Sequence, residues 1–193
     1  MSDYRVVCEA LEAVRAYVDE GVRADHAGKY LPTVVLDASA LATRRDGDGT
    51  GLVPAIVPYR IRLDGRRSVP RFSELDGASA PADDAGAAID VHFLFLTLGG
   101  EGDGLRACEM VAWCAQRLAA APVFDAARLG RSDDAEAHVL YDDLSLDMIL
   151  RLFQGFGGRF APCASYVLRL KTGTGAAASS APAMPTATRA PAP

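Results

Sequence analysis

A glycine-rich stretch directly after the most apolar segment is the first candidate for chemistry. Residues 89–98 are the longest strongly apolar run, and four glycines follow within the next six residues. Gly99 and Gly104 have the G-x-x-x-x-G spacing of a phosphate-binding loop. Such a loop continues with Lys and Ser or Thr, but here Leu105 and Arg106 follow. The turn therefore lacks both the ammonium group for the phosphates and the hydroxyl ligand for Mg²⁺.

Two acidic side chains argue further against phosphate binding at this turn. Glu101 and Asp103 lie inside it and would repel an anion. The glycines also do not match the G-x-G-x-x-G pattern of dinucleotide-binding folds. We therefore expect a turn that feeds a helix, and no cofactor. A small-molecule-binding domain that uses the Gly99–Gly104 turn is kept as a lesser alternative.

Five arginines within twelve residues form the one basic island of an acidic chain. The net charge is −5 and the pI is about 5.2, whereas the island contains only one acidic residue, Asp64. One interpretation is a solvated strand face and loop. The other is a patch that docks on an acidic protein surface. The arginines concerned are Arg60, Arg62, Arg66, Arg67 and Arg71, of which the first four are our candidate protein-interaction residues.

The cysteines and histidines do not form a recognisable metal motif. No C-x-x-C pair is present, and Cys8, Cys108 and Cys114 fall in predicted helices, where we expect them to be small buried apolar residues. His92 and His138 could approach each other on neighbouring strands. A zinc site needs about four ligands, usually with a close pair, so we predict no metal site.

No catalytic constellation is evident either. The chain has no G-x-S-x-G elbow, and no cysteine lies in a recognisable catalytic context. Asp142 and Asp143 are adjacent, as are Asp133 and Asp134, and neighbours on a strand point to opposite faces. We expect these four to be solvated turn acids. We predict that the protein is not an enzyme.

The composition indicates one globular domain followed by a tail. Half of the 193 residues are hydrophobic, which is enough for a sizeable core. The acidic balance argues against nucleic-acid binding, and neither a signal peptide nor a membrane span is evident, so we expect cytoplasmic assembly. Residues 1–171 are predicted to fold, whereas residues 172–193 are rich in Ala, Pro, Ser and Thr and are predicted to be a disordered tail.

Periodicity predicts the elements that would position these residues. Gly21 favours the end of the first helix, Pro58 favours an edge position or a bulge in its strand, and Ser145 is predicted to cap the short helix. Residues 44–49 are predicted to be a solvated loop. The predicted helices are residues 4–22, 105–121 and 144–153, and the predicted strands are residues 33–37, 55–63, 89–98, 136–141 and 163–171.

The order of these elements, with several local segments, resembles a known family. The chain is similar to the tail-terminator, or cap, proteins of extracellular contractile injection systems of the antifeeding-prophage type. The segments that carry the resemblance are the Arg-rich strand 58–67, the apolar strand 89–97, the helix ending in Ala121-Pro122-Val123-Phe124, the short helix 144–153, and residues 158–162 and 165–170.

The resemblance implies a fold, a function and partners. The fold would be α+β, a phage tail-terminator-like twisted and mainly antiparallel sheet of about four to five strands with packed helices. The protein would form a ring, a hexamer, that caps the inner tube and the contractile sheath of a phage tail-like particle. Its partners would be itself, the sheath protein and the inner tube protein, with no nucleic acid and no membrane. Another phage-tail-like completion or adaptor protein is the alternative.

Overall fold

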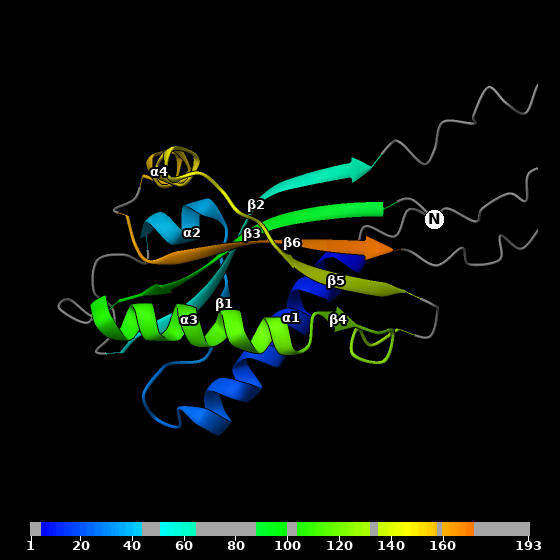
Figure 1. Ribbon diagram of the computed structural model, residues 1–193, viewed down its shortest axis with the longest axis horizontal. Helices are drawn as coiled ribbons and strands as arrows, with labels where there is room; N and C mark the ends of the chain where they lie inside the picture. Colours follow the sequence, from blue (N-terminus) through cyan, green and yellow to red (C-terminus); the bar gives the residue numbers. More distant parts are fainter. Residues whose placement is uncertain are drawn as a thin grey trace, which may run out of the picture.

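The fold is a six-stranded sheet with helices on both faces (Figure 1). The computed structural model describes residues 5–43, 51–64, 88–99, 104–131, 135–157 and 160–171. The helices are α1 (Arg5–Asp25), α2 (Ala38–Thr43), α3 (Gly104–Ala120) and α4 (Leu146–Gly155). The strands are β1 (Val34–Val35), β2 (Val53–Asp64), β3 (Ala88–Leu98), β4 (Val123–Phe124), β5 (Glu136–Tyr141) and β6 (Cys163–Lys171).

The strands are ordered β1-β2-β3-β6-β5-β4. All neighbours are antiparallel except β1 and β2, which are parallel. The predicted α+β class with a mainly antiparallel sheet is confirmed. The predicted count of four to five strands is too low: β1 lies within the predicted strand 33–37, but the two-residue edge strand β4 was not predicted.

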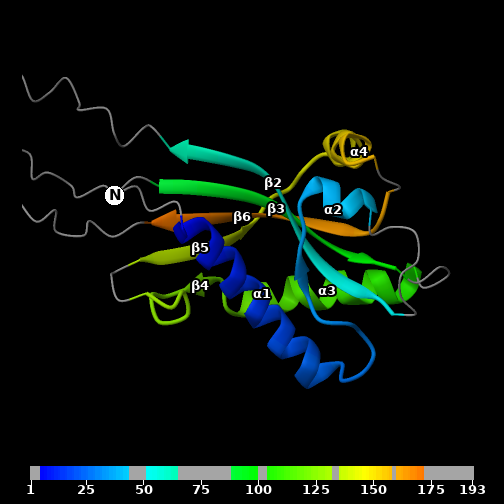
Figure 2. The same cartoon turned by 180° about the vertical axis from the view of Figure 1, so that it is seen from behind.

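Strand β3 is buried on both faces, which explains its continuous apolar sequence. Val91, Phe93 and Phe95 face the core formed with α1 and α3. Leu94 and Leu96 face a second core, to which α2 and α4 contribute. Figures 1 and 2 show α1 and α3 on one side of the sheet and α2 and α4 on the other. The segment 89–98 is thus the centre of the fold, as its sequence predicted.

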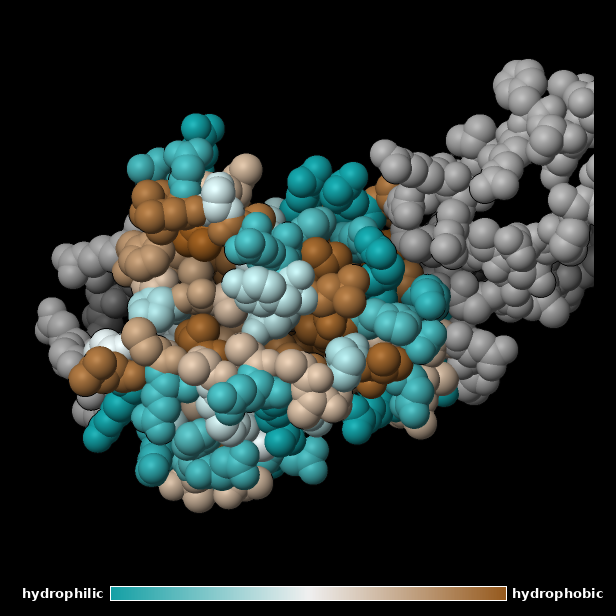
Figure 3. Space-filling view, in the orientation of Figure 1, coloured by the Kyte–Doolittle hydropathy of each residue, from teal (hydrophilic) through white to brown (hydrophobic). Residues whose placement is uncertain are grey.

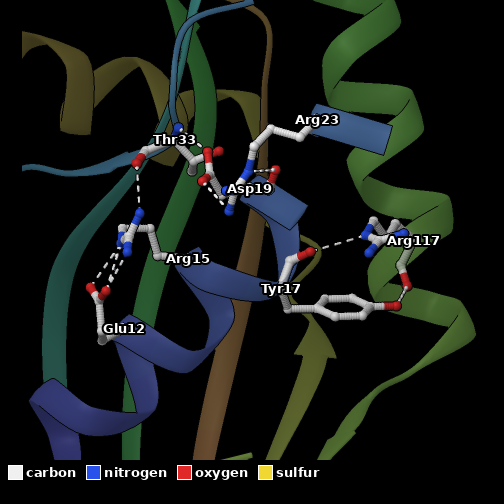
Figure 4. Close-up of polar contacts among 7 residues, drawn as sticks. All are labelled: Glu12, Arg15, Tyr17, Asp19, Arg23, Thr33 and Arg117. Atoms are coloured by element: carbon white, nitrogen blue, oxygen red, sulfur yellow. Dashed lines mark hydrogen bonds and ion pairs between the residues drawn. The ribbon is translucent and has the colours of Figure 1, made fainter. Parts of the chain in front are cut away.

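Helix α1 crosses α3 at Gly21. The Arg117 guanidinium lies so close to Gly21 that a Cβ there would be 2.3 Å from Arg117 Cζ. Arg117 Nε donates to the Tyr17 carbonyl at 3.1 Å, and the Tyr17 hydroxyl donates to the Arg117 carbonyl at 3.2 Å (Figure 4). The prediction that Gly21 ends the helix is therefore wrong. The glycine allows close helix packing, and α1 continues to Asp25.

A buried carboxylate on α1 fixes the connection that leads to β1. Asp19 Oδ1 accepts from the Thr33 backbone N–H at 2.9 Å, and Asp19 Oδ2 forms an ion pair with Arg23 (Figure 4). Arg15 reaches the Thr33 carbonyl while it also pairs with Glu12. The carboxylate is thus satisfied despite its burial, and it holds the chain at the entry to the sheet.

Two features of the helices differ from the predictions. Helix α2 was not predicted: it lies between the predicted strand 33–37 and the predicted loop 44–49, and Asp37 stabilises its first turn by accepting from Ala40 N–H at 2.7 Å. These hydrogen bonds, from the Ala40 backbone first and the Ser39 hydroxyl next, hold the pKa of Asp37 below its usual range.

Cys114 is buried as predicted, but Cys8 and Cys108 are exposed because they lie off the apolar faces of α1 and α3.

Candidate interaction surface

Strand β2 carries the described part of the basic island. Its pairing with β3 shifts register between Pro58 and Arg60, so Tyr59 forms a bulge, as Pro58 predicted. Beyond the bulge, Arg60 lies opposite His92 and Arg62 lies opposite Asp90. Both arginines are exposed and share one sheet face. The other predicted interaction residues, Arg66 and Arg67, lie outside the described residues, as does Arg71.

Among the described residues, no helix covers the sheet face around Arg60 and Arg62. In Figure 1, α2 and α4 lie over one end of this face, and strands β2, β3, β6 and β5 continue beyond them. On these continuing strands alternate residues point to this uncovered face. Figure 3 shows hydrophilic and hydrophobic patches side by side there. We call this surface the open face; its members are Arg60, Arg62, Asp90, Glu136, His138, Leu140, Val167, Arg169 and Lys171.

One bidentate ion pair forms the centre of the open face. Arg169 Nε and Nη2 donate to the two Asp90 carboxylate oxygens at 2.8 and 3.0 Å. The hydrogen bonds from Arg169 hold the pKa of Asp90 below its usual range, and the charges of Arg169, His92 and Arg62 add to this. Asp90 therefore stays ionised and neutralises the arginine that lies between it and β5.

A second charged group lies on the neighbouring strands. His138 Nε2 lies 3.1 Å from Glu136 Oε1, and Lys171 Nζ lies 3.7 Å from Glu136 Oε2. His138 and His92 are separated by β6, so the suggestion that they lie on neighbouring strands is wrong. Among the open-face residues whose side chains are described, four are Arg or Lys and two are carboxylates, in a chain whose net charge is −5.

The two outermost arginines are the ones whose charge is available. Among the described residues, no carboxylate lies within ion-pair distance of Arg60 or Arg62, whereas Arg169 and Lys171 each have one. An arginine without a partner retains its full field toward solvent. The positive potential of the open face is therefore concentrated at the outer edge of β2.

A polar cluster beside the open face contains the residue types of a catalytic triad. Asp142 Oδ2 accepts from the Tyr59 hydroxyl at 3.1 Å and from the Ser165 hydroxyl at 3.4 Å, and it lies 3.1 Å from His92 Nδ1. The Tyr59 and Ser165 oxygens are 3.0 Å apart. Burial raises the pKa of Tyr59 to about 12. The prediction that Asp142 is a solvated turn acid is therefore wrong.

The connectivity of this cluster does not support nucleophilic catalysis. In a triad the serine donates to one imidazole nitrogen while the carboxylate orients the other. Here the Ser165 hydroxyl donates to the Asp142 carboxylate, and His92 Nδ1 lies next to the same carboxylate. His92 Nε2 is buried and has no hydrogen-bond partner among the described residues. Among the described residues, no imidazole nitrogen therefore accepts from the serine, as a triad requires. The cluster instead fixes the end of β5 against β2, β3 and β6, where the chain leaves for α4.

The glycine turn after β3 is a structural feature in its described part. Gly99 has φ +83°, and a Cβ there would lie 2.8 Å from the Gly51 carbonyl oxygen. Only glycine tolerates both this backbone conformation and this approach. Gly100, Glu101, Gly102 and Asp103 lie outside the described residues. The expectation that glycine is needed to turn the chain is thus confirmed at Gly99.

The opposite end of the molecule carries an exposed apolar patch on and beside α4. Ser145 caps this helix as predicted, since its hydroxyl accepts from the Met148 N–H. Figure 3 shows hydrophobic side chains over this helix. Grouped exposed apolar side chains are typical of surfaces that contact other proteins. The patch consists of Leu146, Met148, Leu150 and Phe160, which are 41–62% exposed.

The described ranges contain no candidate metal site and no candidate membrane span. Among these residues, no three His, Cys, Asp or Glu side chains come together as a metal site. None of the helices in the same ranges is both long enough and apolar enough to cross a membrane.

The fold and the surface together define a class of protein. The molecule is an α+β domain whose sheet ends in an open face with exposed arginines, and a hydrogen-bonded polar cluster lies beside that face. The sequence model described as the Pvc16 N-terminal domain matches residues 9–186. Because this match covers most of the chain, the protein belongs to the Pvc16 N-terminal domain family.

Two solved structures are similar to this chain. The sheath/tube terminator of an extracellular contractile injection system, PVC, in its extended state matches with a TM-score of 0.54 and 14% identity. The match covers 100% of this chain and 65% of that chain. The tube-terminating cap of the anti-feeding prophage matches with a TM-score of 0.46 and 13% identity, over 83% of this chain and 54% of that chain. Curated proteins give no significant match.

Proposed function

We propose that this protein is a structural cap of a contractile injection system. The observation that carries the proposal is the family match over residues 9–186. The shared fold with a sheath/tube terminator supports it. The chain spans 65% of the length of that terminator, so the role of the whole terminator is transferred here only as part of the proposal.

The proposed mechanism is templated assembly at the end of a helical polymer. Copies of the chain form a closed ring, a hexamer, through a heterologous interface that matches the symmetry of tube and sheath. The ring binds the last layer of subunits and presents no surface on which another layer can grow. This role is structural and needs no catalysis.

The open face is the proposed contact surface toward the polymer. Arg60 and Arg62 are exposed and have no ion-pair partner among the described residues, so they can meet acidic groups of the tube or sheath. Arg66 and Arg67 follow directly in the sequence and are proposed to extend the same contact. Charges placed in this way raise association rates and select partners more than they add affinity.

Removal of the gene tests the cap role. Particles from the deletion strain are expected to have tubes and sheaths of abnormal length, measured in electron micrographs. Re-expression of the parent chain should restore a uniform length. Particles of normal length in the deletion strain would contradict the proposal. Labelled protein at the baseplate end would instead identify a completion or adaptor protein.

Symmetry of the ring is tested separately. Native mass spectrometry of the purified protein, or averaging of particle ends, should give six copies. A different stoichiometry at the end of the particle would overturn the hexamer while leaving the cap role intact.

A further inference from the structure

Strand β2 has a long free edge. Its other neighbour, β1, pairs only at Ala55 and Ile56, and Leu36 N–H adds one hydrogen bond to the Ile56 carbonyl. Within the described part of the chain, no strand pairs with residues 57–64 on the side away from β3. At about 3.3 Å per residue this edge is about 26 Å long. Its outward N–H and C=O groups are a template for another strand.

Strand pairing is interrupted along the inner part of this edge, whereas the backbone of the outer part is regular. Pro58 and the bulge at Tyr59 interrupt pairing near α2. From Arg60 to Asp64 the register with β3 is continuous, and this stretch contains no proline. Ile61 and Leu63 are 59% and 74% exposed although both are large apolar residues. Natural sheets rarely leave such an edge uncovered.

We infer that the outer edge of β2 binds an extended segment of a different protein by strand addition, and that this segment alternates acidic and apolar residues. Side chains of paired strands lie about 5 Å apart on each face. An acidic residue of the added strand would therefore meet Arg60 or Arg62 on the open face. The intervening apolar residues would cover Ile61 and Leu63 on the other face. The inference rests on this edge and is independent of the cap role.

The charge pattern disfavours a second copy as the occupant. A two-fold pairing of β2 with β2 would place the same patch against itself. In antiparallel registers centred on Ile61 or on Arg62, at least one arginine would lie directly opposite an arginine of the other copy, and like charges in that position are destabilising. The same two residues favour an acidic strand. The edge thus combines protection against self-association with selection of a partner.

Short capped peptides test the mode of binding with the full 193-residue chain. The probe alternates Glu and Val, a second peptide replaces Glu by Lys, and a third has the composition of the probe with all Glu before all Val. The probe is expected to bind and to slow amide hydrogen exchange at residues 60–64. The Lys peptide should bind at least about tenfold more weakly. The blocked peptide should give no protection at these amides.

Exchange of charge makes the test specific for the two arginines. The Arg60→Glu/Arg62→Glu variant should reverse the preference and bind the Lys peptide more tightly than the Glu peptide. A Lys29→Glu/Arg151→Glu variant carries the same change of charge at two other exposed positions and should keep the parent's preference. Equal loss of binding in both variants would show attraction to net charge alone and would overturn the inference.

The apolar side of the edge is tested with a third variant. Ile61→Lys/Leu63→Lys should lower the affinity for the Glu peptide without preventing folding, because both side chains are exposed in the free chain. Absence of binding at millimolar probe, or protection of amides away from β2, would refute strand addition. If the parent forms dimers in sedimentation analysis and Leu63→Lys abolishes them, the occupant is a second copy and the inference is wrong.

Discussion

The two ends of the sheet share the same central strands but are covered differently. Near Phe95, β3 has α1 and α3 on one face and α2 and α4 on the other. Near Asp90, only the face toward α1 and α3 belongs to the core, and the opposite face carries charged side chains. Figures 1 and 2 show the strands continuing past α2 and α4. One chain thus contains a doubly covered end and an open end.

This difference separates the residues that specify the fold from those available for contact. At the covered end, large apolar side chains are removed from water, at about 1.5–3 kcal/mol each before ordering costs. At the open end, the strands are held by backbone pairing and by one buried core, while the exposed arginines add little to stability. Changes at the two ends should therefore have effects of different size and kind.

The largest effect is expected in the covered end. Phe95 is fully buried, and Phe95→Ala removes a ring from the core that α1 and α3 share with the sheet. The free energy of unfolding should fall by about 3–5 kcal/mol in denaturant titrations. Phe160→Leu, at an exposed ring, is the control and should change it by less than about 0.5 kcal/mol. Similar losses in both variants would contradict the distinction between core and surface.

A smaller loss is expected at the turn that follows the covered end. Gly99→Ala introduces a Cβ at φ +83° and against the Gly51 carbonyl oxygen. The cost should be about 2 kcal/mol, measured by the same titration. Gly130→Ala is a useful control, since its φ is +68° but nothing lies within 4 Å of the added Cβ. A loss at position 99 no greater than at 130 would show that the close approach is unimportant.

The sequence was most informative where local pattern determines structure. The predicted strands 136–141 and 163–171 match β5 and β6, and the exposure of Arg60 and Arg62 agrees with a polar strand face. The polar cluster could not be predicted in this way. Asp142 meets Tyr59, His92 and Ser165 only because three other strands and the bulge in β2 bring them together.

Short helices and helix faces limited the prediction in another way. Helix α2 has six residues, too few for a periodic pattern, and its signal was the cap at Asp37. Cys8 and Cys108 were assigned to the correct helices but to the wrong face, because one position along a helix turns a side chain by about 100°. Gly21 was predicted to end the helix because glycine often does so. Its contact with Arg117 joins residues far apart in the sequence, and a local pattern does not reveal it.

The ion pair at the centre of the open face, between Arg169 and Asp90, should have an intermediate effect with a defined pH dependence. Arg169→Met removes both hydrogen bonds that Asp90 accepts from Arg169. It should lower the free energy of unfolding by about 1 kcal/mol at neutral pH. Arg169 holds the pKa of Asp90 below its unfolded value. The stabilisation is therefore present above that unfolded value, about 3.9, and is lost as the pH falls through the folded pKa.

The measurement for this variant is a pair of urea titrations at neutral and at acidic pH. The difference between parent and Arg169→Met should shrink as Asp90 becomes protonated in both proteins. A difference that stays constant down to pH values below the folded pKa would show that Arg169 acts by packing its aliphatic stem rather than by its charge.

The smallest effect on stability is expected at the outer edge of β2. Arg60 and Arg62 are exposed and have no ion-pair partner among the described residues, so Arg60→Ala/Arg62→Ala should change the free energy of unfolding by less than about 0.5 kcal/mol. In the deletion strain, however, this stable variant should fail to restore uniform particle length, whereas Arg151→Ala on α4 should restore it. If the double variant unfolds as easily as Arg169→Met, the two arginines belong to the fold. If it is stable and restores normal length, the open end makes its contacts without them.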